Sequence, residues 1–170
     1  MGQCIAVVSG KGGTGKTSFT AGVGAALALS GLRVLCVDCD IGLRNLDIAL
    51  GLSDAALMDF SDVAQQRCTL ERAVVSHPQL AKLSLLTAPI RQRGQPVTGE
   101  QMASLLRAVR IQYDFCLLDA PAGLGDGFLL ATAAADRCVV VTTADASSLR
   151  DAQHTVMELG RFGPGKLHLV

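Results

Sequence analysis

Short apolar stretches alternate with longer segments of helical length along this chain. The apolar stretches predict strands at residues 3–9, 33–37, 83–87, 114–118, 137–142 and 166–170. Segments of helical length lie between most of them, at residues 16–30, 100–110, 127–135 and 147–162. Strands that alternate with helices are typical of right-handed βαβ units. We therefore expect an α/β fold, with a mostly parallel β-sheet and helices on both faces in a three-layer α/β/α arrangement.

The sequence predicts mobile loops at residues 43–52 and 88–99. The first follows the carboxyl end of a predicted strand, and ligands of open parallel sheets bind at that edge. The chain stops at residues 167–170, on an apolar stretch with no closing helix. Because an internal strand at a chain end would leave its edge bare, we expect a single domain, 1–170, that is truncated at its carboxyl end.

The composition argues against several classes of function. Hydrophobic residues make up 49% of the chain and charged residues 18%, which suits strands that are covered on both faces. The 15 acidic and 15 basic residues balance, so the charge gives no reason to expect a nucleic-acid partner. No apolar run approaches the roughly 20 residues of a membrane-spanning helix, and the chain begins with a predicted strand rather than a signal peptide. We expect a cytoplasmic protein.

The most informative motif lies at the first predicted strand-to-helix junction, where residues 10–17 read Gly-Lys-Gly-Gly-Thr-Gly-Lys-Thr. A strand before it and a helix after it are the context of a phosphate-binding loop. Its glycines let successive N–H groups turn toward phosphate oxygens, and the helix N-terminus adds partial positive charge. Lys16 would reach the β- and γ-phosphates, and the Thr17 hydroxyl would bind Mg²⁺. The alternative is a Gly-rich turn that holds no ligand.

Three aspartates stand at predicted strand ends beside this loop. Asp38 and Asp40 follow the second strand two residues apart, and residues at that spacing in a strand point the same way. Asp119 ends the fourth predicted strand, and next to a phosphate-binding loop an acid at that position is expected to hold a Mg²⁺-bound water. Alternatively, Asp38 pairs with Lys16 or caps the turn that follows the strand.

The cysteines give a weaker signal. Six of them mostly lie in apolar stretches and are expected to be small buried residues in a reducing compartment: Cys4, Cys36, Cys39, Cys68, Cys116 and Cys138. Cys36 and Cys39 form a C-x-x-C pair, which leaves a redox pair or half of a metal site as an alternative. No second pair at zinc-like spacing accompanies it, and it ends a strand instead of opening a helix.

Lys11 is a residue that an ordinary phosphate-binding loop does not require. With it, the motif resembles the deviant Walker A sequence K-G-G-x-G-K-T of the MinD/ParA family of P-loop ATPases. The resemblance implies a sandwich dimer in which Lys11 contacts the ATP of the other subunit and neutralises charge on the transferred phosphoryl group. The alternative for Lys11 is a solvated surface lysine.

The resemblance also implies a role for each site residue, with ATP and Mg²⁺ as cofactors. The implied catalytic residues are Lys11, Lys16 and Asp40, of which Asp40 helps to place the attacking water. The implied Mg²⁺ site consists of Thr17, Asp38 and Asp119. The implied nucleotide-binding residues are Gly10, Lys11, Gly12, Gly13, Thr14, Gly15, Lys16, Thr17 and Ser18.

Within the family, the chain is most similar to the MinD branch of division-site ATPases, over essentially all of its length. The segments that carry this similarity are residues 38–47, 68–73, 119–123 and 147–152. Three features separate it from other branches: Ile41-Gly42 in place of the Pro-Gln of partition ATPases, Arg44 in place of the Ala more common in flagellar-number ATPases, and no cluster cysteine in residues 123–128, unlike the nitrogenase iron protein. Ala120 and Gly125-Asp126 depart from the MinD pattern.

For a full-length protein, the resemblance implies an ATP-dependent homodimer with a division-inhibitor partner and an activator protein. It also implies inner-membrane association through a carboxyl-terminal amphipathic helix. Residues 1–170 contain neither this helix nor the Asn-Arg segment that the resemblance expects to recognise adenine. By the same analogy, residues 147–152 are a partner surface, or ordinary helix capping. The alternatives on this fold are an ATPase that positions flagella or another polar structure, a partition ATPase, and a carrier of metal or iron-sulfur clusters.

Overall fold

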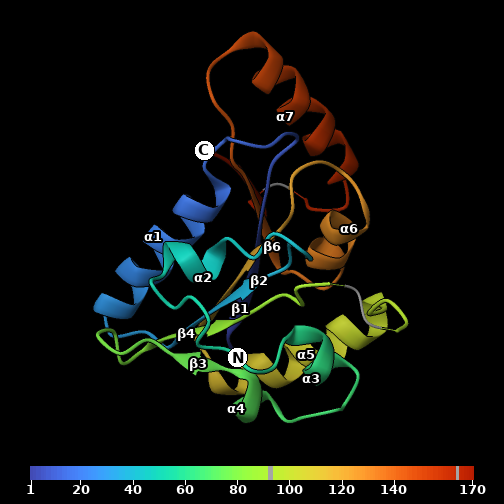
Figure 1. The fold of residues 1–170 in the computed structure, drawn as a ribbon. Helices are drawn as coiled ribbons and strands as arrows, with labels where there is room; N and C mark the ends of the chain where they lie inside the picture. Colours follow the sequence, from blue (N-terminus) through green and yellow to red (C-terminus); the bar gives the residue numbers. More distant parts are fainter. Residues whose placement is uncertain (92–93, 164) are drawn as a thin grey trace.

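The computed structural model describes residues 1–91, 94–163 and 165–170 (Figure 1). Over these residues the chain forms one seven-stranded sheet in the order β3-β4-β2-β5-β1-β6-β7. The strands are β1 (Gln3–Val8), β2 (Val34–Asp38), β3 (Val75–Ser76), β4 (Leu83–Leu86), β5 (Phe115–Asp119), β6 (Arg137–Val140) and β7 (Leu167–Leu169). All neighbouring strands are parallel apart from the antiparallel β3–β4 pair. The prediction of a mostly parallel α/β fold is confirmed.

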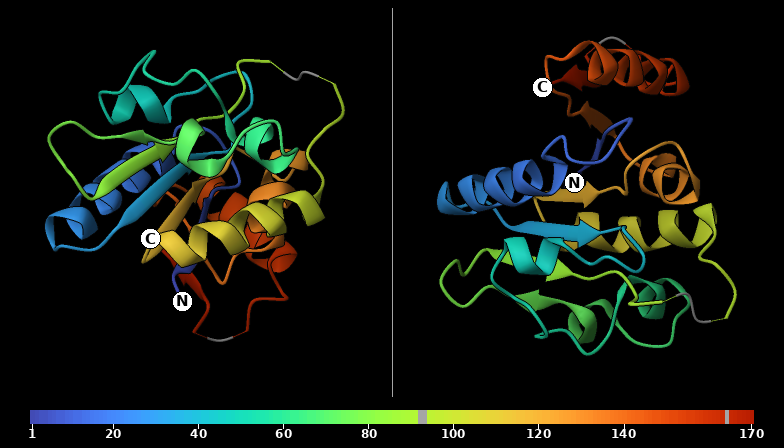
Figure 2. Two further views of the ribbon diagram at one scale, coloured as in Figure 1. Left: turned by 90° about the horizontal axis from the view of Figure 1, so that it is seen from below. Right: turned by 45° about the horizontal axis from the view of Figure 1, so that its top comes forward.

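Helices cover both faces of the sheet, as expected for a three-layer arrangement (Figures 1 and 2). They are α1 (Lys16–Leu29), α2 (Leu46–Ala49), α3 (Phe60–Ala64), α4 (Leu70–Ala73), α5 (Gly99–Gln112), α6 (Asp126–Ala133) and α7 (Ala146–Glu158). One apolar cluster packs α1 and α2 against the sheet, and a larger one packs α3 to α7 against it. Strands such as β2, buried along their whole length, therefore read as continuous apolar runs in the sequence.

The predicted strands and long helices agree with the structure to within a few residues, but four short elements were missed. Helices α2, α3 and α4 and strand β3 have two to five residues each, which is too short for a helical or alternating period to emerge. Helix α2 lies inside segment 43–52, which the sequence predicted to be a loop. The N-terminus of α3 does carry a readable signal, a reciprocal capping box between Asp59 and Asp62.

The second predicted loop, 88–99, is described except for residues 92–93, and its described part up to residue 98 carries no helix or strand. The last predicted strand is present as β7, which pairs with β6 and is the outermost strand on that side of the sheet within the described part of the chain. Among the described residues, no helix is long and apolar enough to cross a membrane.

The sheet order brings three chain segments together at one edge. Strands β2, β5 and β1 are parallel neighbours, so their carboxyl ends face the same way. Asp38, the last residue of β2, is in register with Asp119, the last residue of β5. The loop that follows β1 carries the Gly-rich motif, at the edge where open parallel sheets bind ligands.

Candidate nucleotide-binding site

The Gly-rich loop connects β1 to α1 and leaves the first turn of the helix open to a ligand. Gly15, the residue before α1, has a φ of 92°, and Gly13 has a φ of 79°. Residues with a Cβ rarely adopt such angles, which is why glycine is needed at both positions. Within the described residues, no side chain caps α1. The N–H groups of its first turn therefore present donors and partial positive charge, as at a phosphate site.

A cavity of about 540 Å³ opens over this helix end, which is within the usual range for small-ligand sites. Its lining is Gly12, Gly13, Gly15, Lys16, Thr17, Ser18, Asp40, Leu43, Asn45, Ile48, Ala49, Ala120 and Ala122. The lining thus combines the Gly-rich loop and α1 with the loop after β2, helix α2 and the loop after β5. The predicted site residues outside the lining are Gly10, Lys11, Thr14, Asp38 and Asp119.

Lys16 supplies the positive charge inside this cavity. It is only 8% exposed, and burial lowers the pKa of its ammonium group. The carboxylates of Asp119 and Asp40 oppose that shift. Asp40 is half-buried, and burial raises the pKa of its carboxyl group while Lys16 lowers it. A buried ammonium group that lines the cavity is positioned to bind phosphate oxygens.

Asp119 and the threonine hydroxyls bonded to it form the candidate metal site. The Thr17 hydroxyl donates a hydrogen bond of 2.7 Å to Asp119 Oδ2, and the Thr20 hydroxyl donates one of 3.2 Å to Oδ1. Burial raises the pKa of the Asp119 carboxyl group, against the hydrogen bond from Thr17. Hydroxyl and carboxylate oxygens are the ligands that Mg²⁺ prefers, so Thr17 and Asp119 fit this metal. The contact of Thr20 with Asp119 was not predicted from the sequence.

Asp38 is bonded to its own loop. Its Oδ1 accepts a hydrogen bond of 2.8 Å from the N–H of Asp40, and its Oδ2 accepts one of 3.1 Å from the N–H of Leu46. Burial raises the pKa of its carboxyl group to about 6, although both backbone N–H groups favour the ionised form. The turn-capping alternative describes this arrangement. The charges that act on the pKa of Lys16 are those of Asp119 and Asp40 instead. The Mg²⁺ role of Asp38 stays a prediction.

Lys11 points to the N-terminus of α7. Its Nζ lies 3.4 Å from Oδ1 of Asp145, and the two side chains are 36% and 54% exposed. Asp145 caps α7: it accepts hydrogen bonds from the N–H and hydroxyl of Ser148 and from the Thr143 hydroxyl. These hydrogen bonds hold the pKa of Asp145 well below its usual range, and the bonds from Ser148 have the largest effect. Asp145 was not predicted, because no local signal links residues 134 positions apart.

Ser148 belongs to that capping network and is 1% exposed. This favours the capping alternative for that residue of segment 147–152. The phosphate-binding loop touches the same helix at Gly10, where a Cβ would lie 2.5 Å from the backbone oxygen of Asp151. Thr14 has a buried hydroxyl that has no hydrogen-bond partner within residues 1–91, 94–163 and 165–170.

The C-x-x-C cysteines do not form a pair. Cys36 packs in the apolar cluster under α1 and α2, and Cys39 in the cluster on the other face of the sheet. Both are fully buried, and burial raises the pKa of the Cys36 thiol to about 12. Among the described residues, no group of three or more His, Cys, Asp and Glu side chains is arranged to hold a metal ion.

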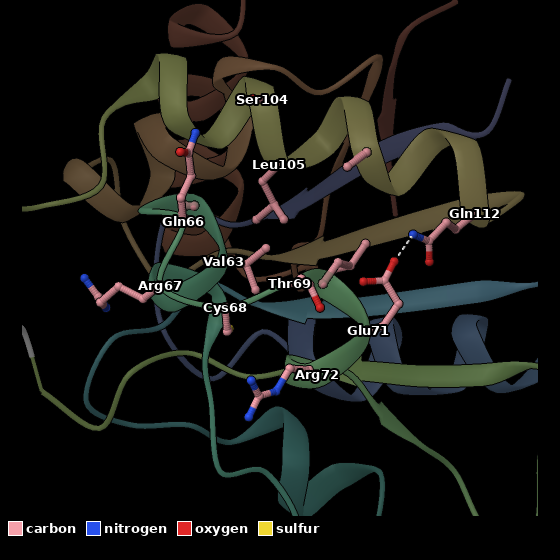
Figure 3. A pocket seen from close by; sticks show the side chains of 13 residues that line it. Val63, Gln66, Arg67, Cys68, Thr69, Glu71, Arg72, Ser104, Leu105 and Gln112 are labelled. Carbon is pink, nitrogen blue, oxygen red and sulfur yellow. Dashed lines mark hydrogen bonds between the residues drawn. The ribbon is translucent and has the colours of Figure 1, made fainter.

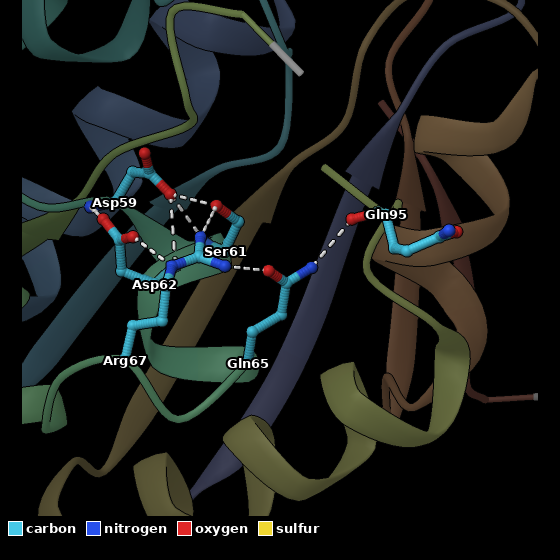
Figure 4. Close-up of polar contacts among 6 residues, drawn as sticks. All are labelled: Asp59, Ser61, Asp62, Gln65, Arg67 and Gln95. Carbon is cyan, nitrogen blue, oxygen red and sulfur yellow. Dashed lines mark hydrogen bonds and ion pairs between the residues drawn. The ribbon is translucent and has the colours of Figure 1, made fainter. Parts of the chain in front are cut away.

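A second cavity, of about 600 Å³, lies between α5 and the segment that joins α3 to α4 (Figure 3). Across this cavity, the side-chain amide of Gln112 donates a hydrogen bond to the carboxylate of Glu71. On its rim, Arg67 bonds to Asp62, Ser61 and Gln65, and Gln65 reaches the backbone oxygen of Gln95 (Figure 4). None of the predicted site residues lines this cavity.

The parallel sheet, the Gly-rich loop at the first strand-to-helix junction and the buried Lys16 together define a P-loop NTPase. The profile of the family described as "ParA: NUBPL iron-transfer P-loop NTPase" matches residues 1–161. Septum site-determining protein MinD of Synechocystis is 40% identical over 170 residues, and that of Bacillus subtilis is 39% identical over 158 residues. The chain belongs to the MinD/ParA family of P-loop ATPases, in its MinD branch.

Solved structures agree with this placement. The MinC:MinD complex of Aquifex aeolicus aligns over 98% of this chain and 67% of that chain, with a TM-score of 0.88 and 36% identity. MinD of Pyrococcus horikoshii, in complex with Mg-ADP, aligns over 99% of this chain and 68% of that chain, with a TM-score of 0.82 and 30% identity.

The curated relatives are longer than this chain. It is covered completely by the alignment to the Synechocystis protein, of which it spans 64%. The alignment to the Bacillus subtilis protein covers 92% of this chain and 59% of that protein.

Proposed function

We propose that this chain is the nucleotide-binding part of a MinD-like ATPase that acts as a switch in cell division. The observation that carries the proposal is the cavity at the carboxyl edge of the sheet, where an uncapped helix N-terminus, buried Lys16 and the Thr17–Asp119 pair converge. Such a site suits a triphosphate with a bound metal ion. The family membership supports ATP as the nucleotide.

Each residue of the site has a role in this proposal. Backbone N–H groups of the loop and of α1 bind phosphate oxygens, and the Lys16 ammonium group neutralises their charge. Thr17 and Asp119 hold Mg²⁺, which supplies further positive charge to the phosphates when it is bound. Asp40, which lines the cavity, orients the attacking water. These roles need no covalent intermediate on the protein, because phosphoryl transfer depends mainly on position and charge.

The site is completed by a second copy of the chain. Lys11 lies outside the cavity lining in this protomer, and its side chain is partly exposed. In the proposed ATP-dependent homodimer, Lys11 of each copy reaches the nucleotide of the other. Hydrolysis then returns the dimer to monomers, which makes the nucleotide the signal that sets the state of the switch.

Partners follow from the relatives and remain part of the proposal. A solved structure with 36% identity is a MinC:MinD complex, which supports a division-inhibitor partner. We further propose that an activator protein stimulates hydrolysis. We also propose that this protein is cytoplasmic and that its longer form associates with the inner membrane. These roles would be served by parts of the protein beyond these residues as well as by α7.

Calorimetry of the chain with ATP and Mg²⁺, followed by phosphate release at several protein concentrations, tests the proposal. We expect saturable heat of binding and a turnover per molecule that rises with protein concentration, because hydrolysis needs the dimer. The variant Lys11→Ala should bind ATP and lose the concentration dependence. If ATP plus Mg²⁺ gives no heat of binding, or Lys11→Ala keeps the concentration dependence, the proposal is wrong.

A further inference from the structure

Asp38 and Asp119 end neighbouring strands in register, yet they accept hydrogen bonds from different kinds of donor. Asp119 accepts from the side-chain hydroxyls of Thr17 and Thr20, which can rotate away. Asp38 accepts from two backbone N–H groups, of Asp40 and Leu46. These donors are fixed to the chain, so Asp38 can exchange them for a metal ion only if the loop itself moves.

We propose that Asp38 is a positioning residue that closes the loop 40–46, and that it is not a Mg²⁺ ligand. The two N–H groups it binds stand at the two ends of that loop, so one carboxylate fixes both ends. This inference rests on the proposed function, because it assigns a role inside the same nucleotide site.

Burial makes this role hard to exchange for metal binding. Asp38 is 1% exposed and Leu46 is fully buried. If the carboxylate turned toward a metal ion, the N–H of Leu46 would be left in the protein interior without an acceptor, which folded proteins rarely tolerate. Thr17 and Asp119 supply oxygen ligands without such a penalty.

Further contacts show what the closed loop positions. Within it, the N–H of Arg44 donates to the backbone oxygen of Asp40 at 3.4 Å, and the N–H of Gly42 donates to that of Pro89 at 3.2 Å. Just past the loop, a carboxylate oxygen of Asp47 lies 3.3 Å from the Arg44 guanidinium. Asp40 is therefore held at the lining of the cavity, and Asp38 acts on the reaction through Asp40.

The variant Asp38→Asn separates the two roles, with Asp119→Asn as its matched comparison. Asparagine keeps one acceptor oxygen but places an NH₂ group against the second N–H, so the loop should open. Two quantities are measured: the rate of trypsin cleavage after Arg44 in the nucleotide-free protein, and the Mg²⁺ concentration that gives half-maximal ATP binding by calorimetry. Cleavage after Arg110, at the opposite edge of the sheet, is the control for general unfolding.

We expect Asp38→Asn to accelerate cleavage after Arg44 by at least about fivefold, to leave cleavage after Arg110 unchanged and to change the Mg²⁺ requirement by less than about twofold. Asp119→Asn should raise the Mg²⁺ requirement about tenfold and leave Arg44 protected. If Asp38→Asn raises the Mg²⁺ requirement as Asp119→Asn does, or if Arg44 stays protected, the inference is wrong.

A measurement on the unchanged chain covers the case in which Asp38→Asn fails to fold. Hydrogen exchange of the amides of Asp40 and Leu46 should stay slow when Mg²⁺ and ATP are added, whereas an Asp38 carboxylate that turned toward the metal ion would release at least one of the two amides. If the unchanged chain binds no ATP, the proposed function fails. The trypsin result on nucleotide-free protein would still test the closure of the loop by Asp38.

Discussion

Acidic residues stand at both edges of the sheet, and the two edges treat them in opposite ways. At the amino edge, Asp114 bonds to Arg33 at 2.9 Å and Asp136 bonds to Arg110 at 3.0 Å. The hydrogen bonds from Arg33 lower the pKa of Asp114 to about 2. There each carboxylate has an arginine partner and ties the start of a strand to its neighbour.

At the carboxyl edge, three carboxylates raise one another's electrostatic cost, and one buried lysine acts on two of them. Burial raises the pKa of Asp38, Asp40 and Asp119 at this edge, and Lys16 is the cation that faces two of them. An excess of buried negative charge costs stability unless a cation joins it. The amino edge therefore stabilises the fold, whereas the carboxyl edge gives up stability to keep a site for Mg²⁺ and phosphate.

The largest expected effect separates the two edges by their lysines. Lys16→Ala removes the ammonium group from the cavity and should weaken binding of ATP with Mg²⁺ by about 100-fold in calorimetry. Lys82→Ala is the matched control, because Lys82 donates to the backbone oxygen of Gly31 at the amino edge. It should leave the affinity unchanged within about twofold. Equal losses in both variants would remove the distinction between the edges.

The second prediction concerns stability at the carboxyl edge. Asp119→Asn keeps the shape of the side chain and an acceptor oxygen for one of the two threonine hydroxyls, and the other hydroxyl can accept from the new NH₂ group; the change removes a buried charge. We expect a gain of about 1 kcal/mol, or about 2–4 °C in melting temperature at pH 7 without nucleotide. Differential scanning calorimetry measures it. A lower melting temperature would mean that the attraction between Asp119 and Lys16 stabilises the fold by more than the burial of the Asp119 charge destabilises it.

The third prediction is the opposite sign at the amino edge. Asp114→Asn should lower the melting temperature by about 2–3 °C at pH 7, because it removes a partner of Arg33. A lowered folded pKa gives stability that is present above the unfolded value of 3.8 and lost as the pH falls to about 2. Thermal melts across that range should therefore converge for the two proteins. A difference that persists at pH 2 would point to packing instead of charge.

Sequence reasoning found the carboxyl edge because its chemistry is local. The residues from Gly10 to Thr17 are contiguous, and the aspartates follow apolar strands whose ends must meet at one edge of a parallel sheet. The same reasoning could not decide between the roles of Asp38, since the N–H of Leu46 that it binds depends on how an irregular loop folds back.

Contacts between distant segments were beyond the sequence altogether. The approach of Gly10 to the backbone of Asp151 depends on the packing of α7 against β6, which no local pattern encodes. Short elements were missed for a different reason: α2 and α3 are held by tertiary packing of Leu46 and Phe60, both fully buried, and not by helical propensity.

Asp145 departs from this pattern, since it lies beyond the carboxyl end of β6 and yet has a lowered pKa. It is exposed to solvent and accepts hydrogen bonds from α7, so exposure and donors decide the behaviour of an acid here, and not the edge alone. Asp145→Asn preserves the cap, because asparagine is as good an N-cap as aspartate, but it releases Lys11. Exposed ion pairs contribute little, so the melting temperature should change by less than about 1 °C.

The measurable consequence lies in association. In the proposed dimer Lys11 must leave Asp145 to reach the other copy, so Asp145→Asn should strengthen ATP-dependent dimerisation by up to about fivefold in analytical ultracentrifugation. Asp145→Ala, which also loses the cap, should melt about 2–4 °C lower. Weaker dimerisation of Asp145→Asn would mean that the Lys11–Asp145 contact supports the dimer instead of competing with it, because this variant keeps the helix cap and loses only the charge of Asp145.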